Sequence, residues 1–196
     1  LLLSFFYLIF FSIIGWGILL IKIIDNKINT NNIGLIGLVG LFSLTLISYF
    51  THLFTPHNYL HNLIVISIGL VSLIFFFKKN FLKKNLLISL FISVVLISGF
   101  FVEKNHDDFP FYHLQYSLQL VDSKISFGLG NLTHGWRHHS SIFFLNSIFY
   151  LPYIKYYLFH ISGFLTLIFV NSFIIFNLIN SFSKKNFNST EIFYLM

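Results

Sequence analysis

Two adjacent carboxylates, Asp107 and Asp108, stand in a polar stretch of a chain that is otherwise mostly hydrocarbon. Such a pair can act as a general base, bind a divalent metal ion such as Mg²⁺ or Mn²⁺, or do both. Pro110, however, favours the first turn of a helix, and Asp108 is a good N-cap for that helix. The spacing alone therefore leaves two interpretations open, a catalytic or metal-binding pair and a helix cap.

A second group of candidate residues is cationic and follows about thirty positions later, at Arg137, His138 and His139. The planar guanidinium of arginine suits bidentate binding of phosphate. Ser140 or Ser141 could cap the next helix and offer its N-terminus to an anion. The same cluster could instead be a basic patch that contacts lipid phosphates. Its histidines lack a fixed helical spacing, so they are weak evidence for zinc.

The segment between the two groups has the pattern of a short amphipathic helix. Its apolar residues share one face: Phe111, Leu114, Leu118 and Val121. Its polar residues share another face, headed by Asp108: Tyr112, Gln115, Gln119 and Asp122. Such a helix would lie on a membrane surface with its apolar face down. The polar stripe could line a site for a sugar or a lipid headgroup, or it could simply face water.

The remaining polar features favour structural roles. The glycines in Gly128-Leu129-Gly130-Asn131 permit tight turns, but their spacing fits no phosphate-binding loop. The histidines at the ends of apolar runs are expected at a membrane interface rather than at a metal: His52, His57 and His61. His160 lies inside a long apolar run, where a functional role and a hydrogen-bonded packing role are both open.

Composition defines the protein class. The chain is 56% hydrophobic and 9% charged, with a mean hydropathy of +0.82, which indicates an all-α, polytopic transmembrane helical bundle. The absence of cysteine excludes disulfides and thiolate metal sites. The net charge of +6 does not indicate nucleic acid, because the lysines gather at the ends of apolar runs, where they suit anionic membrane lipids. The sequence does not define an oligomeric state.

Hydropathy predicts one membrane domain over residues 1–196. Its expected spans are about 1–21, 33–50, 60–77, 86–102 and 153–180. A polar insert, 103–152, separates the fourth and fifth spans. The apolar run Ser141 to Leu151 inside it is too short to span and is expected to form an interfacial or re-entrant helix. Because the chain begins within an apolar run, we expect a fragment of a longer protein.

The distribution of basic residues orients the predicted domain. With five spans, eight cationic residues fall on one side: Lys22, Lys27, Lys78, Lys79, Lys83, Lys84, Lys184 and Lys185. The other four fall opposite: Lys104, Lys124, Arg137 and Lys155. Because cytoplasmic loops carry the excess of Lys and Arg, the insert is predicted to be extracytoplasmic.

The residues of the insert resemble those of a family of uncharacterised bacterial polytopic membrane proteins that look like glycosyltransferases of the GT-C class. The resemblance covers roughly 103–152. It is carried by an acidic and aromatic motif, a glycine block and paired serines: His106, Asp108, Tyr112-His113, Gln115, Gly128 to Leu132, Ser140-Ser141 and Phe143. The family's arginine tends to lie nearer Gly135, and asparagine is usual where His139 stands, so this sequence departs from the family pattern at Arg137 and His139.

The resemblance implies a function for each candidate residue. Asp108, helped by Asp107, would be the catalytic base or would hold a divalent metal. The phosphate of a polyprenyl-phosphate-linked sugar donor would meet Arg137, His138 and His139. Tyr112, His113 and Gln115 would line the substrate site.

The resemblance also implies a setting. The protein would act in cell-surface glycan assembly at a bacterial inner membrane, as the N-terminal part of an enzyme with more spans. The alternatives are a transporter or flippase component for a lipid-linked substrate, and a non-catalytic membrane protein.

Overall fold

The computed structural model describes residues 1–25, 31–76, 82–101, 107–131, 134–137 and 140–184. These residues form an all-α fold without a strand, as predicted. The α-helices are α1 (Leu2–Ile24), α2 (Ile33–His52), α3 (Tyr59–Phe76), α4 (Leu82–Val95), α5 (Leu114–Asp122), α6 (Ser141–Ile148) and α7 (Ile161–Lys184). Short helical turns are η1 (Ile97–Phe101), η2 (Phe109–His113), η3 (Leu129–Asn131) and η4 (His134–Arg137).

Four helices in the described part of the chain, α1, α2, α3 and α7, are long and apolar enough to cross a membrane. Continuous helix is the form that an apolar segment takes in lipid, because every backbone N–H and C=O then finds a partner within the segment. These helices suggest a multi-pass membrane protein, as predicted from composition.

The fourth expected span, 86–102, differs from the prediction. The α-helix α4 has 14 residues and ends at Val95, and η1 continues it for five residues as a 3₁₀ helix. Together the two reach about 31 Å at the usual rises per residue. The change of helix type turns Phe100 into the core, where its ring lies 5.3 Å from that of Phe6.

The fifth expected span, 153–180, begins later than predicted. Residues after Pro152 form turns with φ angles of 68° at Tyr153 and 45° at Lys155, and α7 starts only at Ile161. Left-handed backbone of this kind cannot continue a right-handed helix. His160 consequently lies outside the helix, exposed, with Nε2 3.2 Å from the carbonyl oxygen of Phe100.

Small residues allow the long helices to approach closely, as is common between helices in lipid. A Cβ atom on Gly15 of α1 would collide with the backbone carbonyl of Gly69 of α3. At the same contact, Ser12 and Trp16 of α1 donate 2.9 Å hydrogen bonds to the carbonyls of Ile66 and Val65. The polar side chains of this interface are therefore satisfied by the neighbouring helix.

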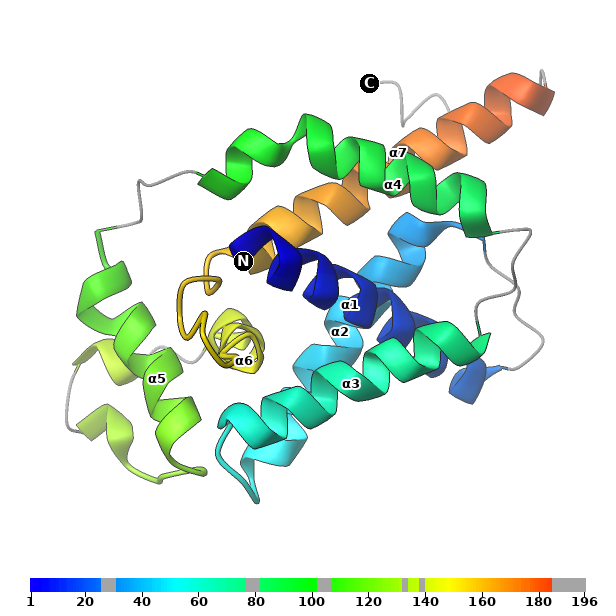
Figure 1. Ribbon diagram of the computed structural model, residues 1–196. Coiled ribbons are helices and arrows are strands. Elements are labelled where there is room, and N and C mark those ends of the chain that lie inside the picture. The colour runs from blue at the N-terminus through cyan, green and yellow to red at the C-terminus, as the bar shows by residue number, and fades with distance from the viewer. Residues whose placement is uncertain (26–30, 77–81, 102–106, 132–133, 138–139, 185–196) are drawn as a thin grey trace.

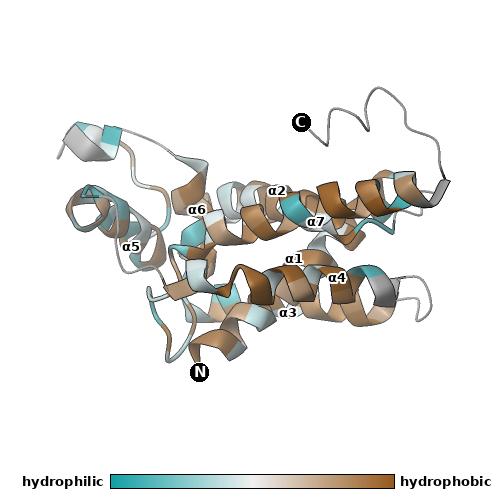
Figure 2. Cartoon of the chain, turned by 90° about the horizontal axis from the view of Figure 1, so that it is seen from above, coloured by the Kyte–Doolittle hydropathy of each residue, from teal (hydrophilic) through white to brown (hydrophobic). Residues whose placement is uncertain are grey.

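The long helices run between two ends of the molecule, and the insert gathers at one of them (Figure 1). There α2 ends, α3 begins, and α6 is seen nearly end-on beside α5. The C-terminal ends of α1, α3 and α7 lie at the opposite end. Apolar residues dominate the long helices, whereas α5 shows more hydrophilic residues (Figure 2). The insert thus has the position expected of a segment at one membrane face.

Candidate functional site

Asp108 stands at the N-cap position of η2, but its side chain makes no capping hydrogen bond. Its Oδ2 instead accepts a 3.4 Å hydrogen bond from the hydroxyl of Tyr112, one turn later. Pro110 lies in the first turn, as predicted, and η2 is a π-helical turn. Of the two interpretations of Asp108, side-chain capping of the helix is therefore wrong. The alternative, a catalytic or metal-binding role, stays a prediction.

Tyr112 and Asp107 are two residues that set the surroundings of Asp108. Desolvation and, second, the Asp108 carboxylate raise the pKa of Tyr112, so the phenol remains a hydrogen-bond donor at neutral pH. Asp107 is exposed and Asp108 is partly buried. Of the two adjacent carboxylates, Asp107 is therefore solvated, whereas Asp108 is held by the hydroxyl of Tyr112.

The face that the helix after η2 turns to the protein agrees only in part with the pattern, since Val121 of the predicted apolar face is 5% exposed but other residues take part that the pattern did not include. α5 packs on α6 through Tyr116 and Leu120, which are 3% exposed, while Phe111 of the predicted apolar face is 73% exposed. The partners of Tyr116 and Leu120 in this cluster are Phe143 and Phe144 of α6. The π-turn holds one residue more per turn than an α-helix, which shifts the register of the pattern.

Two other predicted site residues lie on either side of the same turn. Gln115 is exposed, and its Nε2 donates a 3.4 Å hydrogen bond to the carbonyl of Pro110. His113 is partly buried, with its ring centroid 4.3 Å from that of Tyr112 and 5.0 Å from that of Phe143. The predicted polar stripe is thus solvent-facing at Gln115, and His113 packs against aromatic rings.

The cationic group lies next to the glycine block. Arg137 of η4 donates a 2.9 Å hydrogen bond from Nε to the carbonyl of Gly130, and Gly128 has the positive φ of 82° that its turn requires. The turn η4 also contacts η2, the turn that follows Asp108. His138 and His139 lie outside the described residues. The fold therefore brings the arginine turn to the acidic turn, although about 25 residues separate them in sequence.

The run from Ser141 to Leu151 is helical only to Ile148 and is more buried than an interfacial helix would be. In α6 every residue from Phe143 to Ile148 is buried, because the helix lies between α5 and the spans α2 and α7. Ser140 occupies the N-cap position without a side-chain cap, and Ser141 Oγ accepts a 3.3 Å hydrogen bond from Tyr49 of α2. Ser140 is therefore the N-cap residue, as predicted, but it makes no side-chain capping hydrogen bond.

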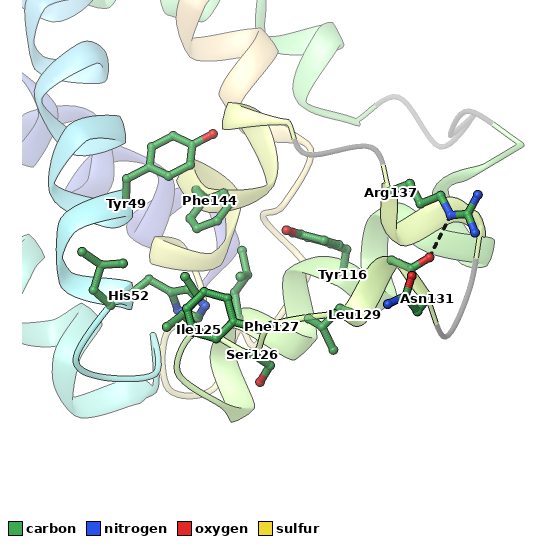
Figure 3. A pocket seen from close by; sticks show the side chains of 14 residues that line it. Tyr49, His52, Tyr116, Ile125, Ser126, Phe127, Leu129, Asn131, Arg137 and Phe144 are labelled. Carbon is green, nitrogen blue, oxygen red and sulfur yellow. Dashed lines mark hydrogen bonds between the residues drawn. The ribbon is translucent and has the colours of Figure 1, made fainter.

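A pocket of about 630 Å³ lies between the end of α2 and the residues that follow α5 (Figure 3). Tyr49, His52 and Leu53 line it from α2, and Arg137 lies at the other end in this view. Residues from α5, α6 and the glycine block complete the wall: Tyr116, Leu120, Phe144 and Ile125 to Asn131. The pocket thus joins the end of a predicted span to the arginine turn.

Histidines at this end form a buried polar network. His57 is fully buried, with Nδ1 2.6 Å from Ser147 Oγ and Nε2 3.0 Å from the carbonyl of Ser48. Its ring stacks on that of His61, with centroids 4.8 Å apart. Burial and, second, the positive charge that His61 can carry lower the pKa of His57 to about 3. These histidines are buried or partly buried in the protein, and their predicted position at a membrane interface stays a prediction.

Among the described residues, no group of three or more His, Cys, Asp and Glu side chains could hold a metal ion. Asp107 and Asp108 are thus two carboxylates without a third such side chain placed to share a metal ion with them among the described residues. A cation at this pair would need substrate or water oxygens as further ligands.

Comparison with known proteins places the whole sequence in one family. A family model described as a domain of unknown function, DUF8201, matches residues 1–196. The chain belongs to this family. No curated protein and no solved structure matches it.

In this DUF8201 chain, sequence reasoning missed two features of the site. Asn62 and Ser147 occur in apolar runs, yet both are buried at the histidine network. The sequence signal that could have revealed this network is Asn62, a single asparagine near the start of a predicted span, because a polar amide in lipid needs hydrogen-bond partners. The pocket had no signal, because its wall comes from four separate segments.

Proposed function

We propose that this chain is the membrane-embedded part of a GT-C-like glycosyltransferase that uses a polyprenyl-phosphate-linked sugar donor. The observation that supports it is the approach of two turns, η2 behind Asp108 and η4 with Arg137, at the end of the bundle where the insert gathers. A base and a cation on adjoining turns are what transfer from a lipid phosphate requires. The resemblance in the insert points to the same chemistry.

In this proposal Asp108 is the general base. Its carboxylate would take the proton of an acceptor hydroxyl as that oxygen attacks the anomeric carbon and the bond from sugar to phosphate breaks. Tyr112, which donates to Oδ2, orients the carboxylate. Asp107 and Asp108 would hold a Mg²⁺ or Mn²⁺ ion if the enzyme uses one, since such ions are commonly bound by one or two carboxylates together with substrate phosphate.

Arg137 is the proposed partner of the leaving phosphate. Its Nε is occupied by the carbonyl of Gly130, which fixes the guanidinium while the terminal nitrogens keep their hydrogens for phosphate oxygens. Positive charge at this place would stabilise the negative charge that develops as the sugar departs. His138 and His139 would add to it, and Tyr112, His113 and Gln115 would contact the donor or acceptor.

The proposed setting is a bacterial inner membrane, with the insert on the extracytoplasmic face. The excess of lysines beside the opposite ends of the predicted spans supports this orientation. A lipid-linked donor would then reach the insert from the surrounding membrane, and its product would belong to a cell-surface glycan.

The test is sugar transfer by the full-length protein in membrane vesicles. Vesicles receive polyprenyl phosphate that carries a radiolabelled sugar, and released polyprenyl phosphate and labelled glycan are measured together. Stoichiometric release and labelling support the proposal. Movement of intact donor across the bilayer without cleavage would instead indicate the flippase alternative and would overturn the transferase.

A further inference from the structure

The pocket beside the arginine turn has no role in the transfer chemistry proposed above, apart from Arg137 at its edge. Two of its walls are the last turn of α2 and the buried helix α6, so it opens where a predicted span ends. A volume of about 630 Å³ is within the usual range of small-molecule sites.

The wall of the pocket is mainly apolar. Eight large apolar or aromatic side chains contribute to it: Tyr49, Leu53, Tyr116, Leu120, Ile125, Phe127, Leu129 and Phe144. Phe127 is 92% exposed, which is unfavourable in water for a phenylalanine at the edge of a hollow. A hydrocarbon chain in the pocket would cover this surface, whereas a wholly polar ligand would leave it uncovered.

Two polar groups mark the ends of this apolar wall. Arg137, exposed, lies at one end, and His52 at the other (Figure 3). His52 is only 4% exposed, and its Nδ1 has no hydrogen-bond partner among the described residues. A buried nitrogen without a partner is costly. Because Nδ1 has almost no accessible surface, the imidazole would turn to present it to a polar ligand atom in the pocket, and the hydrogen bond gained would favour that turn.

We propose that this pocket binds a single-chain anionic amphiphile that carries a hydroxyl or similar polar group on its hydrocarbon chain. The carboxylate or phosphate head pairs with Arg137, the chain lies on the aromatic wall, and the chain's polar group meets Nδ1 of His52. Charge complementarity selects the head, and the unpaired imidazole nitrogen selects the substituted chain. The binding does not depend on glycosyl transfer and would hold if that activity were absent.

The experiment measures binding to the full chain in phosphatidylcholine nanodiscs, without a sugar donor. Photoactivatable stearate is crosslinked, and competition by stearate, 12-hydroxystearate, stearyl phosphate and stearyl alcohol is quantified. The hydroxylated acid should compete better than stearate. Stearate and stearyl phosphate should compete at least about tenfold better than the neutral alcohol, since a charged hydrogen bond is being gained. The comparison of acid and phosphate distinguishes the two possible heads.

Substitutions separate the contribution of Arg137 to ligand binding from that of His52. Arg137→Gln should remove the advantage of the anions over the alcohol, and His52→Phe should remove only the advantage of the hydroxylated acid. Phe127→Ala should weaken binding of all four ligands, whereas Phe54→Ala, another exposed phenylalanine outside the pocket, should not. Because Arg137 and Phe127 are exposed, these variants keep the fold even if His52→Phe does not. Equal competition by acid and alcohol, or unchanged binding in Arg137→Gln, would overturn the proposal.

Discussion

Nδ1 of His57 lies 2.6 Å from Oγ of Ser147, and this contact joins the loop after α2 to helix α6 of the insert. The other ring nitrogen, Nε2, faces the carbonyl of Ser48 at 3.0 Å and must donate to it. Oγ of Ser147 also lies 2.8 Å from the carbonyl oxygen of Phe144, and its single hydrogen can serve only one of these two acceptors. The low pKa of His57 favours a neutral imidazole with its hydrogen on Nε2, in which Nδ1 accepts from the serine hydroxyl. The insert is held to the ends of the spans by a histidine that is stable in its uncharged form.

The first prediction concerns pH. The pKa of His57 is about 3 in the folded protein against 6.5 as its ordinary value, so between these values the unfolded chain binds more protons. Stability should be independent of this group above about pH 6.5 and fall by about 1.4 kcal/mol per unit below it. Chemical unfolding in nanodiscs at pH 7.5, 6.5 and 5.5 measures the slope.

The matched control for this prediction is an exposed histidine. His160→Gln should retain the pH dependence of the native chain, whereas His57→Gln should reduce the slope by the contribution of this one ring, whatever its stability at pH 7.5. An unchanged slope in His57→Gln would contradict the assignment of a buried neutral ring.

The second prediction concerns Asn62, which is fully buried and donates from Nδ2 to the carbonyls of His57, Ser147 and Tyr150, at 2.7 to 2.9 Å. Asn62→Leu keeps the number and branching of the side-chain heavy atoms but leaves these buried carbonyls without their donor. We expect a loss of stability of about 2 to 4 kcal/mol, from at least two unsatisfied groups. Thermal unfolding followed by tryptophan fluorescence measures it. Leu60→Ala, at an exposed position of the same helix, should change the midpoint little.

The sequence predicted the broad architecture because long apolar runs in lipid have one solution, the helix. It did not predict the start of α7. There Tyr153 and Lys155 take up left-handed backbone, which their residue types disfavour and which is closed by a local 2.9 Å hydrogen bond from Lys155 N to the carbonyl of Leu151. A hydropathy profile does not represent hydrogen bonds of this kind.

The third prediction concerns the α1–α3 contact. A Cβ on Gly15 would collide with the backbone of Gly69, which is unable to move away as a flexible side chain could. Gly15→Ala should therefore cost about 1 to 3 kcal/mol, in spite of the better helix propensity of alanine. Gly163→Ala in α7 is the control, because no atom lies within 4 Å of a Cβ at that position. Comparable unfolding midpoints for both variants would contradict the packing.

The fourth prediction concerns membrane topology. The chain has no cysteine, so single cysteines can be placed without background. Ser126→Cys, exposed in the insert, should react with a membrane-impermeant maleimide in intact cells. Asp25→Cys, beyond the opposite end of α1, should react only after the cells are permeabilised. The reverse pattern would place the insert in the cytoplasm.

The candidate site was partly predictable because residue types, like the apolar runs that predicted the fold, can be read directly from the sequence. Residue types marked Asp108, Tyr112 and Arg137 as unusual in a chain of this hydropathy, and the structure brings their turns η2 and η4 into contact. The buried face of α5 was predictable only in part, because an apolar pattern assumes an unbroken α-helix and a π-turn precedes this one. Tyr116, an amphipathic residue, took the place that the pattern gave to Phe111.

The central claim is that Asp108 is the base of a glycosyl transfer at the insert, and Asp108→Asn in the full-length protein tests it most directly. Sugar transfer in vesicles should fall at least about 100-fold, the usual contribution of a general base, with expression and unfolding midpoint unchanged. Asp122→Asn, an exposed carboxylate at the end of α5, should retain full transfer. Transfer by Asp108→Asn at the native rate would contradict the account.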